Sequence, residues 1–183
     1  MKMIETKLPS VFILEPKVFK DNRGFFIETY NNKVLENFGI NYEFIQDNHS
    51  LSVEAGTIRG LHYQLEDKAQ TKLVRVTRGA IYDVAVDIRK ESSTYGKWVG
   101  AILSEDNKRQ LIIPKGFAHG FCTLVTNTEV QYKVDELYSP EHDRGILWND
   151  PEIGIEWPTS SPILSDKDTK HPVLSEAENN FEC

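Results

Sequence analysis

Residues 113–121 read IPKGFAHGF, and this stretch shows how the whole chain is built. Pro114 and Gly116 predict a turn that ends one apolar run and delivers His119 into the next. Similar short runs, rich in β-branched and aromatic residues, recur along the chain between turn signals such as DNRG, EAG, SEDN and TNTE. Many short strands at this spacing predict an all-β antiparallel sandwich or barrel.

Helices are expected to be few, short and mainly C-terminal. One is expected at residues 32–39, NKVLENFG, with Gly39 as its stop signal. After Trp148 strand signals become rare, so loops and short helical turns are expected to cover the barrel there. No internal repeat or composition break divides the sequence, and a single domain over residues 1–183 is expected.

The composition excludes several classes of function. The 183 residues are 39% hydrophobic and 27% charged, which is typical of a soluble globular protein with a substantial core. The formal net charge of -7 disfavours nucleic acid as the main partner, but a few Lys and Arg can still hold a small anion in one pocket. No apolar run fits a transmembrane helix or a signal peptide. The two cysteines, Cys122 and Cys183, suggest no disulfide framework, which favours the reducing cytoplasm.

Alternation along the predicted strands places polar side chains on apolar faces. Lys72 lies on the apolar face of residues 72–76, KLVRV, and Tyr132 lies on that of residues 129–135, EVQYKVD. The buried face of residues 80–89, which contain Asp83, is ambiguous. A buried lysine is costly unless it is paired, and an apolar barrel lined by a few polar groups is typical of a small-molecule site.

Residues 57–64, TIRGLHYQ, carry Arg59 and His62 in one strand-like segment. Strict alternation puts the two side chains on opposite faces of the strand. A β-bulge at Gly60 would instead turn both of them inward. The sequence leaves the two arrangements open.

The stretch IPKGFAHGF resembles the second motif, PxGxxH, of the cupin superfamily. The first cupin motif usually supplies HxH and a downstream Glu as metal ligands, whereas the matching place here reads His62-Tyr63-Gln64. Only His62 and His119 can then be placed as ligands. The resemblance implies a cupin-type double-stranded β-helix, or jelly roll, that works without a metal.

An ordered set of motifs makes the resemblance more specific. The set is DNRGFFIETY, FIQDNHS, TIRGLHYQ, KLVRVTRGAIYDVAVDIR, IPKGFAHGF, VQYKVDELYSP, WNDPEIGIEWP and LSDKD. In this order the motifs, which span about residues 11–174, are similar to those of dTDP-4-dehydrorhamnose 3,5-epimerases. Each motif is weak alone, but the ordered set is specific.

The resemblance implies an isomerase that converts dTDP-4-dehydro-6-deoxy-D-glucose to dTDP-4-dehydro-L-rhamnose, a step towards dTDP-L-rhamnose and cell-surface polysaccharide. The C4 ketone of that substrate acidifies the hydrogens on C3 and C5. A base, an acid on the opposite face of the ring and a partner for the enolate oxygen are therefore sufficient, and no cofactor is implied.

The resemblance also implies the catalytic residues. His62 matches the general base, and histidine suits this role because it is commonly neutral and ready to accept a proton near pH 7. Asp168, in SDKD, matches the carboxylate that orients the histidine, and Asp83 is a further carboxylate expected near that pair. Tyr132 matches the proton donor and Lys72 the group that stabilises charge on the sugar oxygen. Taken alone, a lone histidine or a strand tyrosine is more often a core residue.

A nucleotide-binding set follows from the same resemblance. Arg23 and Arg59 match contacts to the diphosphate, because guanidinium forks suit phosphate oxygens. The positions that match contacts to the nucleotide are Glu28, Gln46 and Asn48.

Other polar residues are expected around the sugar and the phosphates. His119 and Lys167 match contacts on the sugar or phosphate side, and Tyr138 is expected to stack on the base. Asp143 stands where the family has a glutamate, so that a carboxylate is kept but shortened by one methylene. The remaining histidines are interpreted as peripheral: His49, His142 and His171.

The family resemblance further implies a homodimer in which an N-terminal segment, about residues 1–30, crosses to the partner. Arg23 and Glu28 would then serve the neighbouring site. Three alternatives stay open: an epimerase acting at only C3 or only C5 of another dTDP-4-keto-6-deoxyhexose, a metal-dependent cupin oxygenase, and a non-catalytic sugar-nucleotide binding module.

Overall fold

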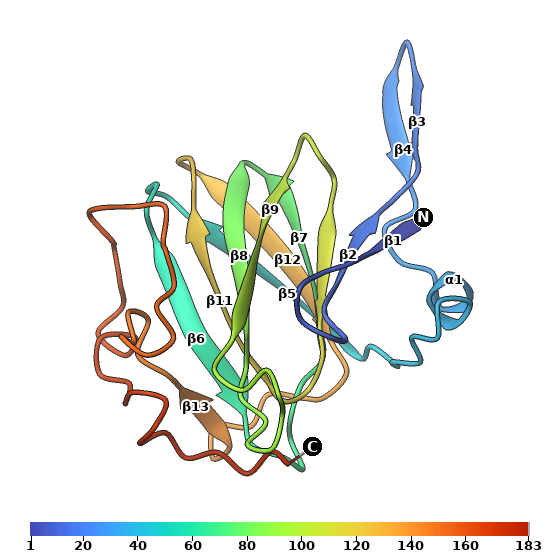
Figure 1. The fold of residues 1–183 in the computed structure, drawn as a ribbon. Helices are drawn as coiled ribbons and strands as arrows, with labels where there is room; N and C mark the ends of the chain where they lie inside the picture. The colour runs from blue at the N-terminus through green and yellow to red at the C-terminus, as the bar shows by residue number, and fades with distance from the viewer. Residues whose placement is uncertain (183) are drawn as a thin grey trace.

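Two antiparallel sheets face each other in the computed structural model, which describes residues 1–182 (Figure 1). The six-stranded sheet has the order β1 (Lys2–Glu5), β2 (Phe12–Glu15), β10 (Gln110–Ile113), β7 (Lys72–Arg78), β12 (Thr128–Val134) and β5 (Gln46–Ser52). The five-stranded sheet has the order β13 (Asp143–Gly145), β6 (Ile58–Gln64), β11 (Phe117–Thr123), β8 (Ala80–Asp87) and β9 (Trp98–Ser104). This two-sheet arrangement is the all-β fold expected from the sequence.

The turn predicted at Pro114 and Gly116 joins the two sheets. Strand β10 ends at Ile113 in one sheet, and β11 begins at Phe117 in the other. Gly116 has a φ of +84°, and a Cβ atom there would lie 2.6 Å from the side chain of Arg89, so glycine is required. The turn therefore carries His119 onto the inner face of the second sheet.

The main core lies between the sheets and follows the predicted alternation. Val74, Val76 and Val130 of the six-stranded sheet pack against Ile81 and Leu103 of the five-stranded sheet, and each is nearly or fully buried. Lys72 and Tyr132 share strand faces with these valines. Their predicted orientation towards the interior is confirmed.

A helix covers part of the outer face of the six-stranded sheet. Helix α1 (Asn32–Glu36) begins after Asn31, whose side chain accepts a hydrogen bond from the backbone N–H of Val34. Gly39, with a φ of +77°, lies in the turn after the helix. Leu35 packs against Leu73 and other side chains of the sheet. The predicted short helix is confirmed.

The C-terminal tail covers the outer face of the five-stranded sheet, as Figure 1 shows beside β6 and β13. Its apolar side chains, which include Ile153, Leu174 and Phe181, pack on the residues of β6, β8 and β11 that face away from the main core. The prediction of short helices mainly at this end is wrong, because the described part of the tail forms turns and no helix. Four prolines interrupt the backbone hydrogen bonding that a helix needs there: Pro151, Pro158, Pro162 and Pro172.

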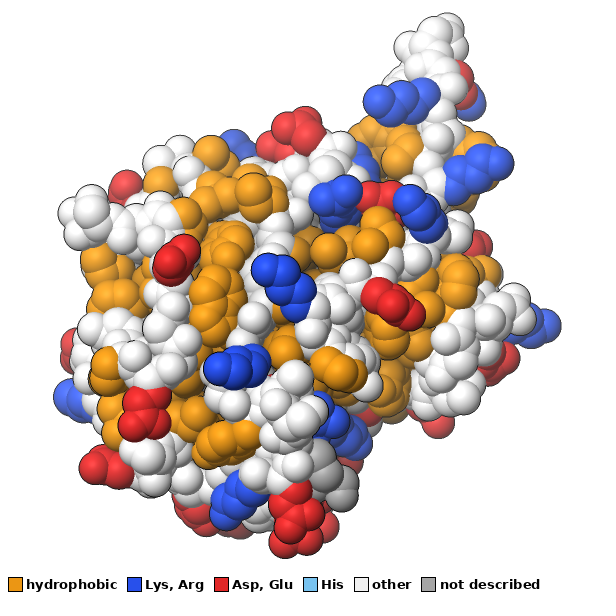
Figure 2. Space-filling model, in the orientation of Figure 1, with side chains coloured by type: hydrophobic (Ala, Val, Ile, Leu, Met, Phe, Trp, Pro, Cys, Tyr) orange, Lys and Arg blue, Asp and Glu red, His pale blue; other side chains and the backbone are white. Residues whose placement is uncertain are grey.

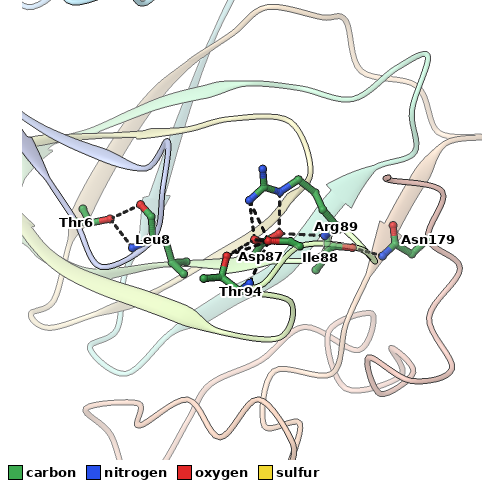
Figure 3. A network of polar contacts seen from close by, with 8 residues as sticks. Thr6, Leu8, Asp87, Ile88, Arg89, Thr94 and Asn179 are labelled. Carbon is green, nitrogen blue, oxygen red and sulfur yellow. Dashed lines mark hydrogen bonds and ion pairs between the residues drawn. The ribbon is translucent and has the colours of Figure 1, made fainter. Parts of the chain in front are cut away.

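A buried carboxylate fixes the loop after β8 (Figure 3). Asp87 accepts hydrogen bonds from the Arg89 guanidinium at 2.9 and 2.6 Å and from the hydroxyls of Ser92 and Thr94 at 2.6 Å each. Burial alone would raise the pKa of Asp87, but these hydrogen bonds hold it below its usual value. Next in the chain, the backbone carbonyl of Ile88 accepts a hydrogen bond from the Asn179 side chain, which ties the tail to this loop.

A third, two-stranded sheet projects beyond the two main sheets (Figures 1 and 2). It is the hairpin of β3 (Val18–Asp21) and β4 (Gly24–Ile27). Three of its aromatic side chains, Phe19, Phe25 and Phe26, are more than half exposed.

No helix within residues 1–182 is long and apolar enough to cross a membrane.

Candidate active site

Strand β6 contains a bulge that turns Arg59 and His62 to the same side. His62 lies opposite His119 of β11, whereas Arg59 lies opposite Phe121, so three steps along β6 match two along β11. Gly60 has a φ of +126°, and a Cβ atom there would lie 2.6 Å from the Cα of Gly120, so only glycine fits. Both side chains line one cavity. Of the two arrangements left open by the sequence, the bulge is confirmed.

The cavity has a volume of about 390 Å³ and opens between the two sheets. Both sheets and the tail contribute to its wall, so residues distant in sequence meet there. The lining residues are Ser50, Thr57, Ile58, Arg59, His62, Lys72, His119, Phe121, Tyr132, Ile163, Leu164, Ser165, Lys167 and Asp168.

His62 and Asp168 form a close pair. Nε2 of His62 lies 2.6 Å from Oδ1 of Asp168, and the Asp168 side chain is only 4% exposed. Ser165 donates a hydrogen bond of 2.8 Å to the other carboxylate oxygen. Burial would raise the pKa of Asp168, but the hydrogen bond from His62 holds it below its usual value, so the group stays anionic. With Nε2–H donating to this anion, the neutral ring keeps its lone pair on Nδ1.

His171 is not peripheral, contrary to the interpretation of the sequence. Its ring lies edge-on to that of His62, with the ring centroids 5.6 Å apart, and its Nε2 lies 3.7 Å from Oδ1 of Asp168. A Cβ atom at Gly145 would lie 2.4 Å from the His171 ring, so the glycine makes room for it. The sequence holds only a weak signal for this position. His171 lies three residues after LSDKD, which favours a place near Asp168, but the proline that follows it is typical of a surface loop.

A second buried pair joins His119 to Asp83. Nε2 of His119 lies 2.6 Å from Oδ1 of Asp83, whose side chain is fully buried. Asp83 therefore orients His119 and not the His62 pair. Burial lowers the pKa of His119 despite the nearby Asp83, which keeps the imidazole neutral at neutral pH.

Lys72 supplies a positive charge beside this second pair. Burial lowers its pKa to about 8, while the Asp83 and Asp143 carboxylates oppose the shift. The ammonium group is therefore charged at neutral pH in a poorly solvated place, where its attraction for a developing oxyanion is strong.

Tyr132 faces the cavity from the six-stranded sheet, opposite His62. Burial raises the pKa of its phenol, and the Arg59 guanidinium only partly offsets the shift, so the group keeps its proton at neutral pH. Arg59 is held by hydrogen bonds to the Ser52 hydroxyl, at 3.1 Å, and to the Leu51 carbonyl, at 3.2 Å. A protonated phenol and an imidazole therefore face the cavity from opposite walls.

The predicted nucleotide-binding residues lie around the cavity in two groups. Asp143 accepts hydrogen bonds from Lys167, which lines the cavity, and from the exposed Tyr138 hydroxyl at 3.0 Å. On β5 the Gln46 amide donates to Asn48 at 2.8 Å, so these two side chains face the same way, as expected. Asn48 is paired with Tyr132 across the strands but, like Gln46, is outside the cavity lining.

Arg23 and Glu28 lie away from this cavity within the same chain. Arg23 is on the turn of the β3–β4 hairpin, where its exposed guanidinium pairs with Asp21 at 2.6 Å. Glu28 follows β4 and is exposed. Two other histidines are peripheral as interpreted: His49 pairs with Glu129 at 3.1 Å, and His142 contacts the Ser139 hydroxyl at 2.8 Å.

Cys122 and the residue at the second cupin-histidine position lie outside the cavity lining. Cys122 is a buried free thiol on β11, while Cys183 lies outside the described residues. Gln64, at the place of the second cupin histidine, donates to the backbone carbonyls of Lys68 and Leu137 at 2.5 and 3.1 Å. Its side chain is thus committed to holding the loops around β6.

Comparison with known proteins gives the family. Residues 5–176 match the sequence model of dTDP-4-dehydrorhamnose 3,5-epimerase. The chain is 59% identical over 169 residues to the dTDP-4-dehydrorhamnose 3,5-epimerase of Shigella flexneri, covering 92% of this chain and 93% of that one. A crystal structure of the Bacillus anthracis 3,5-epimerase with TDP and PPi bound superposes with a TM-score of 0.92 at 62% identity, covering 94% and 98% of the two chains.

The Legionella pneumophila dTDP-6-deoxy-D-glucose-3,5-epimerase, solved in complex with dTDP-4-keto-L-rhamnose, gives a TM-score of 0.92 at 46% identity and covers 96% and 93% of the two chains. These neighbours confirm the cupin-like β-sandwich expected from the sequence. The chain belongs to the dTDP-4-dehydrorhamnose 3,5-epimerase family.

Proposed function

We propose that this protein inverts C3 and C5 of dTDP-4-dehydro-6-deoxy-D-glucose to give dTDP-4-dehydro-L-rhamnose, as a cofactor-independent isomerase of the cytoplasm. The observation that carries the proposal is the placement of His62 and Tyr132 on opposite walls of one cavity, with Lys72 beside them. Inversion of a carbon next to a ketone requires a base on one face of the ring and an acid on the other.

The reaction begins when His62 removes a proton from C3 or C5. Nδ1 forms the new N–H bond, the C–H electron pair enters the enolate, and the positive imidazolium is stabilised by Asp168 at 2.6 Å. Lys72 faces the negative charge that develops on the C4 oxygen. Asp168 acts through His62 and is therefore a positioning residue.

The reaction ends when Tyr132 gives its proton to the same carbon from the opposite face. The phenolate left behind is stabilised by Arg59, whose charge already favours that form. Exchange with water then returns a proton to Tyr132 and removes one from His62. The same steps at the second carbon complete the conversion, and at each centre the incoming proton comes from solvent.

We propose that the nucleotide is held mainly through charge. Arg59 and Lys167 line the cavity and suit the diphosphate, while Gln46 and Asn48 offer amide donors and acceptors to the base. Lys72 and His119 contact the sugar. Tyr138 and Asp143 sit beside Lys167, where the tyrosine ring can stack on the base once substrate enters.

A homodimer explains the position of the N-terminal residues. The hairpin exposes three phenylalanines, and it holds Arg23 away from the cavity of its own chain. We propose that about residues 1–30 of each single-domain chain reach the partner, so that Arg23 and Glu28 complete the neighbouring site. In a symmetric dimer each hairpin would make the same contact.

Subunit mixing tests this exchange. Arg23→Ala and His62→Ala proteins are each expected to be impaired, but a denatured and refolded mixture should regain about a quarter of the wild-type activity, because half of the dimers then carry one intact site. A mixture no more active than its components would contradict the exchange.

The product tests the proposed reaction. Chelator-treated protein is incubated with dTDP-4-dehydro-6-deoxy-D-glucose, the product is reduced with borohydride, and its configuration is read by NMR. Inversion at both C3 and C5 is expected. Inversion at one centre would indicate a single-site epimerase, loss of activity on chelation would indicate a metal-dependent enzyme, and dTDP binding without turnover would indicate a binding module.

A further inference from the structure

His171 places a second imidazole beside the proposed catalytic base. The residue follows Asp168 by one turn of the tail, and its side chain is 11% exposed. Its Nε2 is buried and has no hydrogen-bond partner among the described residues. A buried polar nitrogen without a partner is costly, so this atom needs an explanation beyond packing.

We propose that His62, Asp168 and His171 form a site for a divalent transition metal ion such as Zn²⁺, whose binding switches the catalytic base off. The three side chains each offer one ligand atom, and these atoms all lie within 4.8 Å of one another. Two imidazoles and one carboxylate are a ligand set that zinc prefers. The inference goes beyond the proposed function, because it concerns metal binding that can be measured without turnover.

The three ligand atoms must shift to reach the distances of a bound site. Bonds of about 2.0–2.1 Å in a tetrahedral site place ligand atoms about 3.3 Å apart. Oδ1 of Asp168 lies 2.6 Å from Nε2 of His62 and 3.7 Å from Nε2 of His171, so the first separation must widen by about 0.7 Å and the second shorten by about 0.4 Å. The ligand atoms of the two histidines start within 4.8 Å of each other and must also move closer. Ser165 fixes the carboxylate through its 2.8 Å hydrogen bond, as supporting contacts commonly do at metal sites.

The ion would take the place of a proton. In the metal-free protein Asp168 accepts the N–H of Nε2 of His62. On binding, Nε2 gives up its proton and forms a bond to the metal, while Nδ1 takes up a proton, so the ring stays a neutral imidazole and no oxidation state changes. The remaining coordination position would face the cavity, because His62 and Asp168 line it. An ion there ties up His62 and Asp168, so it acts as an inhibitor.

This site differs from the metal centre of cupin enzymes. His119 turns its Nε2 to Asp83 at 2.6 Å, and the Gln64 amide is bonded to backbone carbonyls. Neither contributes to the cluster around Asp168. Two of its ligands, Asp168 and His171, come from the tail and not from a sheet.

Metal binding is tested directly on chelator-treated full-length protein. Zn²⁺ is titrated in competition with a chromogenic chelator, and Co²⁺ serves as a second probe through its visible absorption. One ion per chain is expected, with affinity at least about 100-fold weaker in His171→Asn. His142→Asn, which removes a histidine whose side chain contacts the Ser139 hydroxyl outside this cluster, is the matched control and should bind as the wild type does.

The activity assay gives a second readout. Zn²⁺ should inhibit the wild type reversibly, a chelator should restore activity, and the concentration for half-inhibition should rise in His171→Asn by the same factor as the dissociation constant. Asp168→Asn provides a second binding variant should His171→Asn fold poorly, and it should also lose the ion. Equal Zn²⁺ affinity in folded wild type and either variant, or no uptake by the wild type, would overturn the proposal. A failure of the proposed epimerase activity would leave the binding result unaffected.

Discussion

The change Asp168→Asn removes the negative charge behind His62 while keeping the shape of the side chain. The amide oxygen can still accept the hydrogen bond from Nε2 of His62, and the Ser165 hydroxyl can accept from the new NH₂ group. The loss is therefore electrostatic. Once His62 holds the substrate proton, the imidazolium and the carboxylate interact by about 4 kcal/mol, taking charge centres about 4 Å apart and an effective dielectric constant of about 20.

That energy sets the size of the effect. At about 1.4 kcal/mol for each factor of ten, the variant should lose about 100- to 1,000-fold in kcat/KM, with the loss mainly in kcat because Asp168 acts through His62. Initial rates are followed by NMR or by a coupled reduction of the product. Asp166→Asn, an exposed aspartate in the same loop, is the control and should keep its activity. A loss smaller than tenfold in a folded Asp168→Asn protein would refute the role of the anion.

Three further predictions concern buried polar side chains. Because Lys72 has a pKa of about 8, kcat/KM should fall as pH rises through that value. Lys72→Gln should lower the plateau of kcat/KM by about 100-fold and remove this fall at alkaline pH. An unchanged alkaline fall in the variant would show that another group titrates there. Tyr132→Phe should slow epimerisation by a factor of about 10² to 10⁴ while proton abstraction continues, so deuterium should still enter the recovered substrate; loss of exchange would show that Tyr132 is needed for abstraction. Asp87→Ala should cost about 3 kcal/mol of unfolding free energy at pH 7 in urea titrations, because it removes the buried carboxylate that accepts hydrogen bonds from Arg89, Ser92 and Thr94. Folding lowers the pKa of Asp87, so its contribution to the free energy of unfolding is present above the unfolded pKa of about 3.9 and is lost as pH falls through the folded pKa. The difference in unfolding free energy between wild type and variant should therefore narrow in acid. A difference that stays constant with pH would contradict this role of Asp87.

Much of the fold could be predicted because its signals are local. Alternation with a period of two places Lys72 and Tyr132 on the core side of their strands, and the structure keeps that register. The turn at Pro114 and Gly116 needs only the backbone preferences of two residues. These features depend on a few neighbouring positions, so one sequence is enough to find them.

Other features depend on contacts between distant segments. Whether Gly60 forms a bulge is decided by the close approach of Gly120, which the sequence does not reveal. Asp83 contacts His119 because β8 and β11 are neighbouring strands. Spacing along the sequence could not tell whether Asp83 would pair with His119 or with His62. The tail lacked the expected helices because packing on the five-stranded sheet, together with its prolines, sets its path.

His171 was missed for a related reason. A histidine before a proline in a polar tail is commonly a surface residue, and only the space left by Gly145 brings its ring beside His62. Arg23 and Glu28 are the opposite case. The family resemblance predicts that they contact the nucleotide, but within one chain they lie outside the cavity.

Solvent exchange tests the central claim most directly. The protein is incubated with dTDP-4-dehydro-6-deoxy-D-glucose in deuterated water, and deuterium at C3 and C5 is followed by NMR beside His62→Ala. We expect label at both carbons with the wild type and at neither with His62→Ala, while both proteins still bind dTDP. Label at both carbons in the His62→Ala protein, at the wild-type rate, would contradict the assignment of His62 as the base.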